Sequence, residues 1–310
     1  MSNTPTNDTE VPANKVGAST HEELEAFERY ATALRMDEID TDTYRDRNDH
    51  HPDLDPAILD TLDRREFDAS YLRAIHAYVL QDVYDWAGDL RKDGETTVAM
   101  GIDHAPPNVM RTVLPHLESD IALDRPDFNT PPRQAIETAA DHWSQMTYLH
   151  PFLDGNSRSQ RVFFNEYLRD AGWELNWDKI DAGAVHGARH VGIMFDDPTY
   201  LAAQLEPGLA PFGDPAAAGS LGRLARTEYT QGRQQVEDKY IAMLTYADAA
   251  SDNPSKDGYT YAAQTRAANR ASAIASRGSL RSTPSRTSAP DSRQRPSVST
   301  GPTSDRSHGR

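Results

Sequence analysis

Twelve consecutive residues, 150–161, combine side chains that together could handle a polyphosphate. The stretch reads His-Pro-Phe-Leu-Asp-Gly-Asn-Ser-Arg-Ser-Gln-Arg. His150 titrates near neutrality, so it could take a proton from an incoming nucleophile. Asp154 offers the hard oxygen ligand that Mg²⁺ prefers while the ion stays bound to phosphate oxygens and water. The stretch therefore predicts a general base and a metal ligand within one loop.

The second half of the stretch is expected to open a helix. Gly155 favours a tight turn, after which Asn156 or Ser157 would begin the helix. A helix start presents unpaired backbone N–H groups and positive partial charge, which suit a phosphate. Arg158 and Arg161 lie three residues apart, so they would share one helical face and bind successive phosphates.

These residues also have a plainer interpretation. His150 could cap a helix, residues 154–155 could form an ordinary turn, and the arginines could lie on a solvated face. The chain contains neither a Gly-Lys-Ser/Thr phosphate loop nor a Gly-x-Gly-x-x-Gly motif. A bound nucleotide would therefore have to use this loop.

Charge is unevenly distributed along the 310 residues. Residues 251–310 hold ten Lys and Arg against four Asp and Glu, a net charge of +6, which leaves −22 on the other 250 residues of a chain whose total is −16. Such an acidic body repels nucleic-acid backbones. Nucleic acid is therefore an unlikely partner, and proteins or nucleotides are more plausible ones.

Composition also bears on location. The chain has no cysteine, which fits a reducing compartment. Its N-terminus has neither a basic region nor an apolar run, and the longest apolar stretches, such as residues 191–195, fall far short of a membrane span. We therefore expect a cytoplasmic protein with no membrane partner.

Hydrophobic periodicity predicts a mostly helical body. In residues 21–36, with Thr20 as N-cap, the apolar positions recur at helical spacing: Leu24, Phe27, Tyr30, Ala31 and Leu34. Further helices are expected over residues 69–86, 107–122, 132–148, 156–171 and 177–194. Only residues 96–100 resemble a strand, and they would form a short hairpin between two helices.

The expected organisation has four parts. Residues 1–20 are polar and predicted to be disordered, and residues 21–210 form the folded domain with its N-terminal helices. Residues 211–250 are a helical extension, in which residues 221–247 form a mixed-charge amphipathic helix. Residues 251–310 are a basic tail rich in Ser, Arg and Pro, predicted to be disordered.

The stretch at residues 150–161 closely resembles the motif of the Fic/Doc family, His-x-Phe-x-(Asp/Glu)-Gly-Asn-Gly-Arg-x-x-Arg. Residues 76–91, which contain Trp-Ala-Gly, are similar to the family's helix and the segment ahead of its flap hairpin. Residues 104–107, His-Ala-Pro-Pro, resemble the segment after that flap, and residues 171–175 continue the motif's helix as in many relatives. The similarity covers roughly residues 50–210.

The resemblance implies an all-α, Fic-type helical bundle with one short β-hairpin flap. It also implies an enzyme that transfers AMP from ATP to a hydroxyl side chain of a target protein, with His150 as the base and Asp154 as the Mg²⁺ ligand. The nucleotide would be bound by Gly155, Asn156, Ser157, Arg158 and Arg161. The flap, Thr96, Thr97, Val98, Ala99 and Met100, would dock a target segment by strand addition.

One residue departs from the family pattern. Ser157 replaces the second glycine, so a side chain stands where the phosphates approach closely. Relatives with altered turns can bind ATP reversed and transfer phosphate, which makes Doc-like phosphotransfer an alternative to AMP transfer. A protein of another class, an inactive scaffold with the Fic fold, would have no need of His150, Asp154, Asn156 and both arginines.

The family's inhibitory helix has the pattern Ser/Thr-x-x-x-Glu-Gly/Asn, and its Glu pairs with the second arginine of the motif. No Glu-Gly or Glu-Asn pair occurs in this chain, and the nearest match is Ser19 to Glu23 followed by Leu24. The resemblance therefore favours a toxin held by a separate small antitoxin over a degenerate built-in helix. A further pair, His186 and His190, has a spacing that can bind a metal, although no Glu follows His186 as a zinc protease requires.

Overall fold

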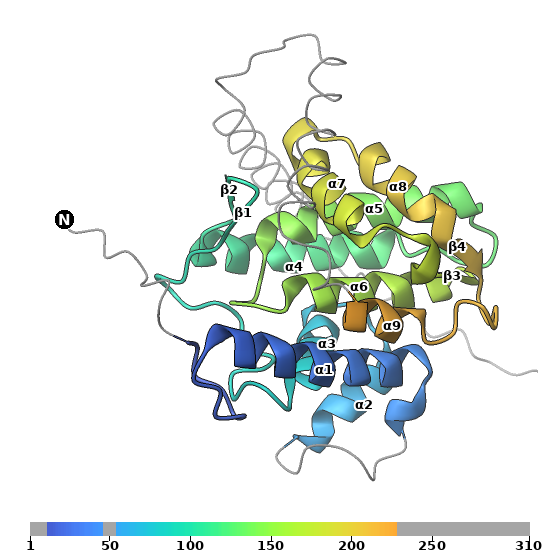
Figure 1. Cartoon of the computed structure of the whole chain (residues 1–310). Helices are drawn as coiled ribbons and strands as arrows, with labels where there is room; N and C mark the ends of the chain where they lie inside the picture. The colour runs from blue at the N-terminus through green and yellow to red at the C-terminus, as the bar shows by residue number, and fades with distance from the viewer. Residues whose placement is uncertain (1–10, 46–53, 228–310) are drawn as a thin grey trace, which may run out of the picture.

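Helix α6 (Asn156–Arg169) runs through the middle of the fold in the computed structural model, which describes residues 11–45 and 54–227. Figure 1 shows α1 (His21–Asp40) and α3 (Ala69–Leu80) on one side of α6, and α4 (Pro107–Leu123) and α5 (Pro132–Leu149) on the other. Every residue of α6 except Ser157 is buried. The motif helix is therefore also the central element of the core.

Shorter elements complete the described part of the chain. The remaining α-helices are α2 (Pro56–Arg64), α7 (Ala182–Phe195), α8 (Thr199–Leu205) and α9 (Ser220–Thr227). Three 3₁₀ turns cover Thr43–Arg45, Trp177–Lys179 and Glu206–Gly208. Strands β1 (Val98–Ala99) and β2 (Ile102–Asp103) form one antiparallel hairpin, and β3 (Trp173–Leu175) pairs antiparallel with β4 (Leu209–Pro211). The predicted all-α class with a short hairpin is confirmed.

Several elements were not predicted. Helix α2 carried a readable signal, because Asp55 caps it by accepting a hydrogen bond from the Ala57 amide at 2.9 Å and Pro56 occupies its first turn. Helix α8 has seven residues, and β3 and β4 have three residues each. Segments this short are too brief for periodicity to identify. The expectation of a single strand segment was therefore wrong.

Two predicted helices end or begin elsewhere. The helix expected over residues 69–86 stops at Leu80, and the chain turns so that the amides of Val83 and Tyr84 both donate to the Leu80 carbonyl. The helix expected over residues 177–194 is divided, because Asp181 caps a new helix by accepting a hydrogen bond from the Ala184 amide at 3.1 Å.

Helix α1 buries only part of the predicted face, namely Leu24 and Ala31, which lie in the core. Phe27, Tyr30 and Leu34 are exposed by 43%, 72% and 40%, so these three do not belong to the core. Buried polar side chains, among them Glu28 and Arg35, take the inner face instead. They are tolerated there because each has a charged partner, and periodicity alone cannot foresee such partners.

The structure describes only part of the segments that were predicted to flank the folded domain. Residues 11–20 were expected to be disordered, yet the Lys15 amide donates to the Val83 carbonyl at 2.8 Å and Val11 and Val16 pack against the core. Helix α9 coincides with the start of the helix expected over residues 221–247. The rest of that helix and the tail at residues 251–310 lie outside the described residues. Within residues 11–45 and 54–227, no helix is long and apolar enough to cross a bilayer.

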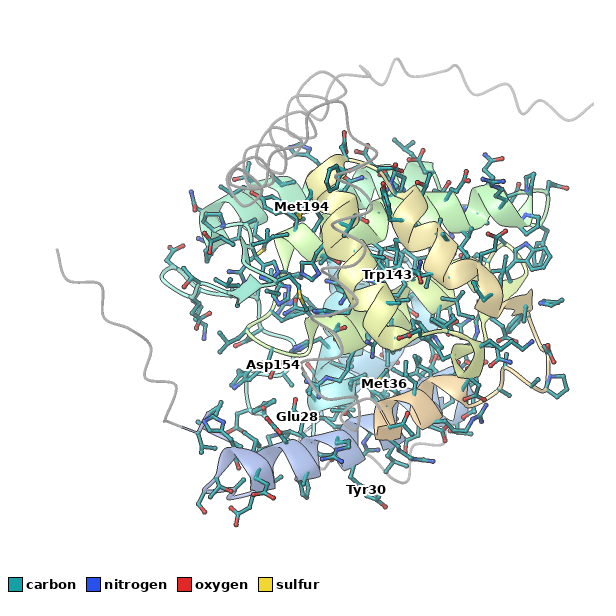
Figure 2. The ribbon with its side chains drawn as sticks, turned by 45° about the horizontal axis from the view of Figure 1, so that its top comes forward. Glu28, Tyr30, Met36, Trp143, Asp154 and Met194 are labelled. Atoms are coloured by element: carbon teal, nitrogen blue, oxygen red, sulfur yellow. The ribbon has the colours of Figure 1, made fainter. Side chains whose placement is uncertain are left out.

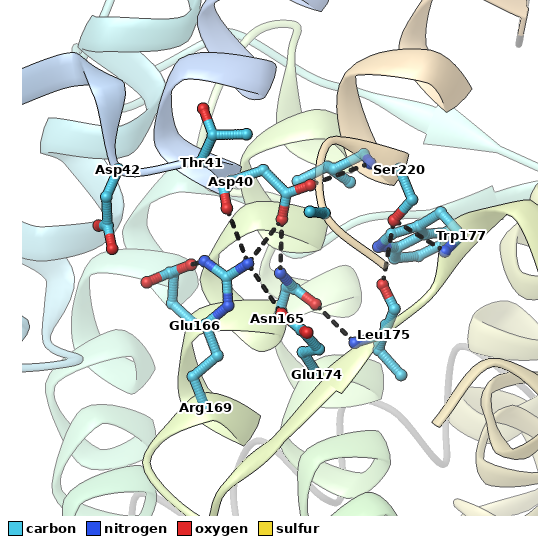
Figure 3. A network of polar contacts seen from close by, with 12 residues as sticks. Asp40, Thr41, Asp42, Asn165, Glu166, Arg169, Glu174, Leu175, Trp177 and Ser220 are labelled. Atoms are coloured by element: carbon cyan, nitrogen blue, oxygen red, sulfur yellow. Dashed lines mark hydrogen bonds and ion pairs between the residues drawn. The ribbon is translucent and has the colours of Figure 1, made fainter. Parts of the chain in front are cut away.

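A buried polar network ties α1 to α6, β3 and α9, as Figure 3 shows. The Asp40 carboxylate accepts hydrogen bonds from Arg169 at 2.8 Å and Asn165 at 3.2 Å, and from the Leu221 amide at 3.3 Å. Arg169 also pairs with Glu166 and Glu174. Burial raises the pKa of the Asp40 carboxyl, which the nearby Arg169 guanidinium opposes.

We expect Asp40→Ala to lower the free energy of unfolding by about 3 kcal/mol, because three buried donors lose their acceptor. Thermal or chemical denaturation measures the change. Glu25→Ala, on the exposed face of the same helix, is the matched control and should be nearly neutral. A loss in Asp40→Ala no larger than in this control would show that the network contributes no net stability.

Candidate active site

The loop between α5 and α6 requires glycine at residue 155. Gly155 has a φ of +75°, and a Cβ atom there would lie 2.4 Å from Leu80 Cδ1 and 3.1 Å from His76 Nε2. Both the left-handed backbone and the close approach to side chains of α3 disfavour any residue other than glycine. His150, the C-cap of α5, is also left-handed with a φ of +44°. The loop is therefore a tight connection held against α3.

Asn156 closes this loop with its side chain. Its Oδ1 accepts from the Phe152 amide at 3.0 Å, and its Nδ2 donates to the Phe152 carbonyl at 2.7 Å. The sequence placed Asn156 among the nucleotide ligands, but the structure commits its side chain to the loop. Because Gly155 has no side chain to cap α6, the first backbone amides of that helix stay open to an anion.

Asp154 lies at the rim of the loop, where Figure 2 labels it. Its side chain is 58% exposed, and Oδ1 accepts from the Gly155 amide at 2.5 Å and pairs with Arg158 Nη2 at 3.4 Å. No group of three His, Cys, Asp or Glu residues that could hold a metal occurs in the described ranges. Asp154 can therefore supply a single carboxylate to a metal that is mainly coordinated by phosphate and water.

His76 fixes the backbone of Asp154 and was not singled out from the sequence. Its Nδ1 accepts from the Gly88 amide at 2.7 Å, so the ring hydrogen lies on Nε2, which donates to the Asp154 carbonyl at 2.9 Å. The ring stacks on Phe152 with centroids 3.8 Å apart. Burial lowers the pKa of His76 to about 4, so the ring is neutral at physiological pH.

The two motif arginines lie in different surroundings. Arg158 forms an ion pair with Glu28 of α1, and the Tyr84 hydroxyl donates to the same carboxylate at 3.1 Å. Figure 2 shows Glu28 on the side of α1 that faces Asp154, whereas Tyr30 points away from the body. Burial raises the pKa of Glu28, while the Arg158 guanidinium lowers it. A carboxylate from α1 thus already contacts one predicted phosphate ligand.

Arg161 is 1% exposed and its guanidinium lies over the Trp177 ring, 5.5 Å from the centroid. It belongs to α6, one turn after the first amides of that helix. Arg158 and Arg161 therefore share the helix, as the spacing predicted, but each is held by a separate element.

A third guanidinium, that of Arg189 on α7, reaches the start of α6. Its Nη2 donates to Ser157 Oγ at 3.0 Å, and its Nη1 donates to Gln160 Oε1 at 3.0 Å. Ser157 is thus positioned by a buried arginine that lies 32 residues further along the chain. No local pattern could have revealed this contact, because it depends on how α7 packs.

The His150 ring lies in a cluster of imidazoles. It stacks on His104 with centroids 3.7 Å apart and an interplanar angle of 6°, and the centroid of His190 lies 6.0 Å from that of His104. Burial lowers the pKa of His150 well below 6.5, and the neighbouring His104, His190 and Arg91 lower it further. The ring is therefore neutral, as a general base must be.

His186 and His190 have protein partners in the structure. His190 Nδ1 lies 2.8 Å from the His186 carbonyl, and His186 Nδ1 lies 2.8 Å from Arg189 Nη2. Burial and Arg189 lower the pKa of both rings. Their four-residue spacing is accounted for by these contacts and by the cluster around His104.

The predicted flap is a hairpin shorter than expected. Among residues 96–100, only Val98 and Ala99 are in a strand, which pairs with Ile102 and Asp103. Thr96 and Thr97 precede the strand, and Met100 is in the turn with a φ of +53°. Val98 is 61% exposed. The hairpin leads directly into His104, whose ring covers His150.

Comparison with known proteins agrees with this arrangement. Residues 66–168 match the model of the Fic/DOC family. The chain is 30% identical over 131 residues to the probable protein adenylyltransferase Fic of Escherichia coli (strain K12), which covers 41% of this chain and 62% of that protein. It is 33% identical over 135 residues to a protein adenylyltransferase of Bartonella henselae, which covers 37% of this chain and 23% of the relative.

Solved structures share the fold. The BepC protein of Bartonella tribocorum, crystallised with bound AMPPNP, has a TM-score of 0.52 at 20% identity and covers 66% of this chain and 95% of its own. A Fic domain from Bartonella quintana with bound ADP has a TM-score of 0.53 at 20% identity and covers 66% and 94%. Residues 66–168 therefore match the Fic/DOC family model, and the fold around them is that of the solved Fic domains.

Proposed function

We propose that this protein transfers AMP from ATP to a hydroxyl side chain of a target protein. The observation that carries the proposal is a neutral His150 at one end of a short loop whose other end is the uncapped start of α6, where Asp154, Arg158 and Arg189 also lie. A base, open amides and cations in one place suit in-line attack on a phosphorus atom. The protein adenylyltransferases to which the chain is similar support the same reaction.

In this reaction His150 takes the proton as the target oxygen bonds to the α-phosphorus. The bond from the α-phosphorus to the bridging oxygen breaks, and pyrophosphate leaves with the electron pair of that bond. The amides at the start of α6 would hold phosphate oxygens, and Arg158 and Arg161 would hold the β- and γ-phosphates. The target would be docked along the hairpin at residues 96–100 by strand addition.

Mg²⁺ fits the donors present. The exposed Asp154 carboxylate would be its protein ligand, and the ion would neutralise charge on the phosphates when bound. The proposed place of action is the cytoplasm, where ATP and protein targets are available. An inactive scaffold is less well supported, because protein recognition alone does not need His150, an exposed Asp154 carboxylate and an uncapped helix start on one short loop.

Doc-like phosphotransfer is the second candidate, and Ser157 is the observation that favours it. The Ser157 side chain, bonded to Arg189, stands at the helix start where the family motif has glycine. A bulkier turn could seat ATP in the reversed direction, with the γ-phosphorus at the base. The two reactions differ in which label of ATP the target retains.

We expect label from α-³²P-ATP, and none from γ-³²P-ATP, to be retained on protein in a lysate. His150→Ala should lower this transfer by about 10²–10⁴-fold, because a positioned base contributes that much. ATP affinity, measured by calorimetry, should stay within a few-fold. Retention of γ-label alone would establish phosphotransfer, and near-normal transfer by His150→Ala would remove His150 from the mechanism.

The pH dependence of transfer tests the state of His150. The base acts in its neutral form, so kcat/KM rises with pH through the folded-state pKa and then levels off. Because the pKa of His150 lies well below 6.5, we expect the profile to be flat from pH 8 down to about pH 6. ATP affinity measured at each pH is the control. A midpoint at or above 6.5 would contradict the neutral base.

Restraint by a separate antitoxin remains part of the proposal, with its Glu directed at Arg161. Glu23, the nearest built-in match, folds back on Ser19, whose amide and hydroxyl both donate to it at 3.0 Å. Glu23 therefore caps α1, as in a capping box. The α1 carboxylate that reaches a motif arginine is that of Glu28, which pairs with Arg158.

We expect Glu28→Gln to tighten ATP binding several-fold and to raise transfer, because the carboxylate competes with a phosphate for Arg158. The glutamine can still accept the Tyr84 hydroxyl, which limits damage to the fold. Calorimetry with ATP gives the affinity, and Glu25→Gln on the exposed face of α1 is the matched control. Equal affinity in both variants would leave Glu28 with a structural role only.

A further inference from the structure

Arg91 is a buried guanidinium that binds only carbonyl groups. It is 2% exposed, and no described residue forms a salt bridge with it. Its Nε donates to the His150 carbonyl at 2.7 Å, and its Nη2 donates to the Leu149 carbonyl at 2.9 Å. Burial lowers the pKa of Arg91. Burying a guanidinium without a carboxylate partner is unfavourable, so we expect Arg91 to have a specific role.

Two of these carbonyls belong to the end of α5. A helix leaves its last carbonyls without partners in the helix, and its C-terminus carries negative partial charge. Arg91 satisfies the carbonyls of both Leu149 and His150, and its own amide donates to the Pro151 carbonyl at 2.8 Å. Because His150 has the left-handed backbone, these bonds hold the base in a conformation that it would not otherwise favour.

The other two carbonyls bracket the hairpin. Arg91 Nη1 donates to the Glu95 carbonyl at 2.9 Å, just before residues 96–104, and Nη2 donates to the Ala105 carbonyl at 2.7 Å, just after them. The Ala105 amide also donates to the Tyr148 carbonyl at 2.9 Å, which joins the end of the flap to α5. One planar group thus holds both ends of the flap and the end of α5.

His104 connects the flap to His150, the proposed base. Its Nδ1 lies 3.0 Å from Thr97 Oγ1, and its amide donates to the Thr97 carbonyl at 3.1 Å, so it belongs to the flap. Its ring lies against His150. Since Ala105 is the next residue, the Arg91 bond to Ala105 also fixes where the His104 ring stands.

We propose that Arg91 is a positioning residue that holds the general base and the target-docking flap in one geometry. The inference rests on the proposed transfer reaction, in which the hydroxyl of a target segment docked on the flap must come within reach of His150. Lysine cannot replace Arg91, because a single ammonium cannot present planar, divergent donors to four carbonyls. The nucleotide site on α6 makes none of these bonds and should be affected little.

The test compares Arg91→Lys with wild type and with Leu62→Ala, a buried residue of α2 that serves as the stability control. In Arg91→Lys we expect kcat/KM for transfer to fall by roughly 10²-fold, as for a small misplacement of reacting groups, while ATP affinity stays within about two-fold. Added guanidinium ion at non-denaturing concentration should restore part of the activity in Arg91→Ala. Transfer at the wild-type rate, or the same loss in Leu62→Ala at equal melting temperature, would overturn the proposal.

A second readout does not depend on activity. Amide hydrogen exchange should become faster at residues 95–105 and 148–151 in Arg91→Lys, and stay unchanged in α1. Leu62→Ala should not show this local pattern. If wild type transfers no label, the proposed reaction fails, and exchange alone then decides whether Arg91 joins flap and base. Uniform exchange in all three proteins would overturn the role of Arg91.

Discussion

The left-handed turn at Gly155 is the constraint on which the rest of the site depends. A side chain at residue 155 would be strained by the left-handed backbone and would have to displace the Leu80 side chain of α3. The loop then ends in a helix start without a side-chain cap, and its other end is the left-handed His150. The proposed base and the helix end proposed to bind phosphate are thereby brought together by a connection of five residues, 151–155.

Buried charges, rather than apolar contacts alone, hold α1 against this core. Glu28, in the interior of α1, pairs with Arg158 near the start of α6, and Asp40, the last residue of α1, pairs with Arg169 at the end of α6. Removing one partner from such a pair leaves an uncompensated charge in a low dielectric. The helix that supplies Glu28 to Arg158 is therefore also a structural part of the fold.

Two buried, neutral histidines, His76 and His104, stabilise the segments around the site. His76 bonds to the Gly88 amide and the Asp154 carbonyl, and His104 bonds to Thr97 of the hairpin while its ring stacks on His150. Burial depresses the pKa of both rings, to about 4 and about 3. Because a neutral imidazole can donate at one nitrogen and accept at the other, His76 joins two segments of the backbone without adding a charge.

The sequence by itself determined the features that depend on local order. The helical class follows from periodicity, and the loop at residues 150–161 follows from residue types that must be neighbours in the chain to make a turn and a helix start. The tertiary structure decided the features that depend on packing. The ion pair of Glu28 with Arg158, the contact of Arg189 with Ser157 and the four carbonyls around Arg91 join residues distant in sequence, and no local pattern specifies which helix faces meet.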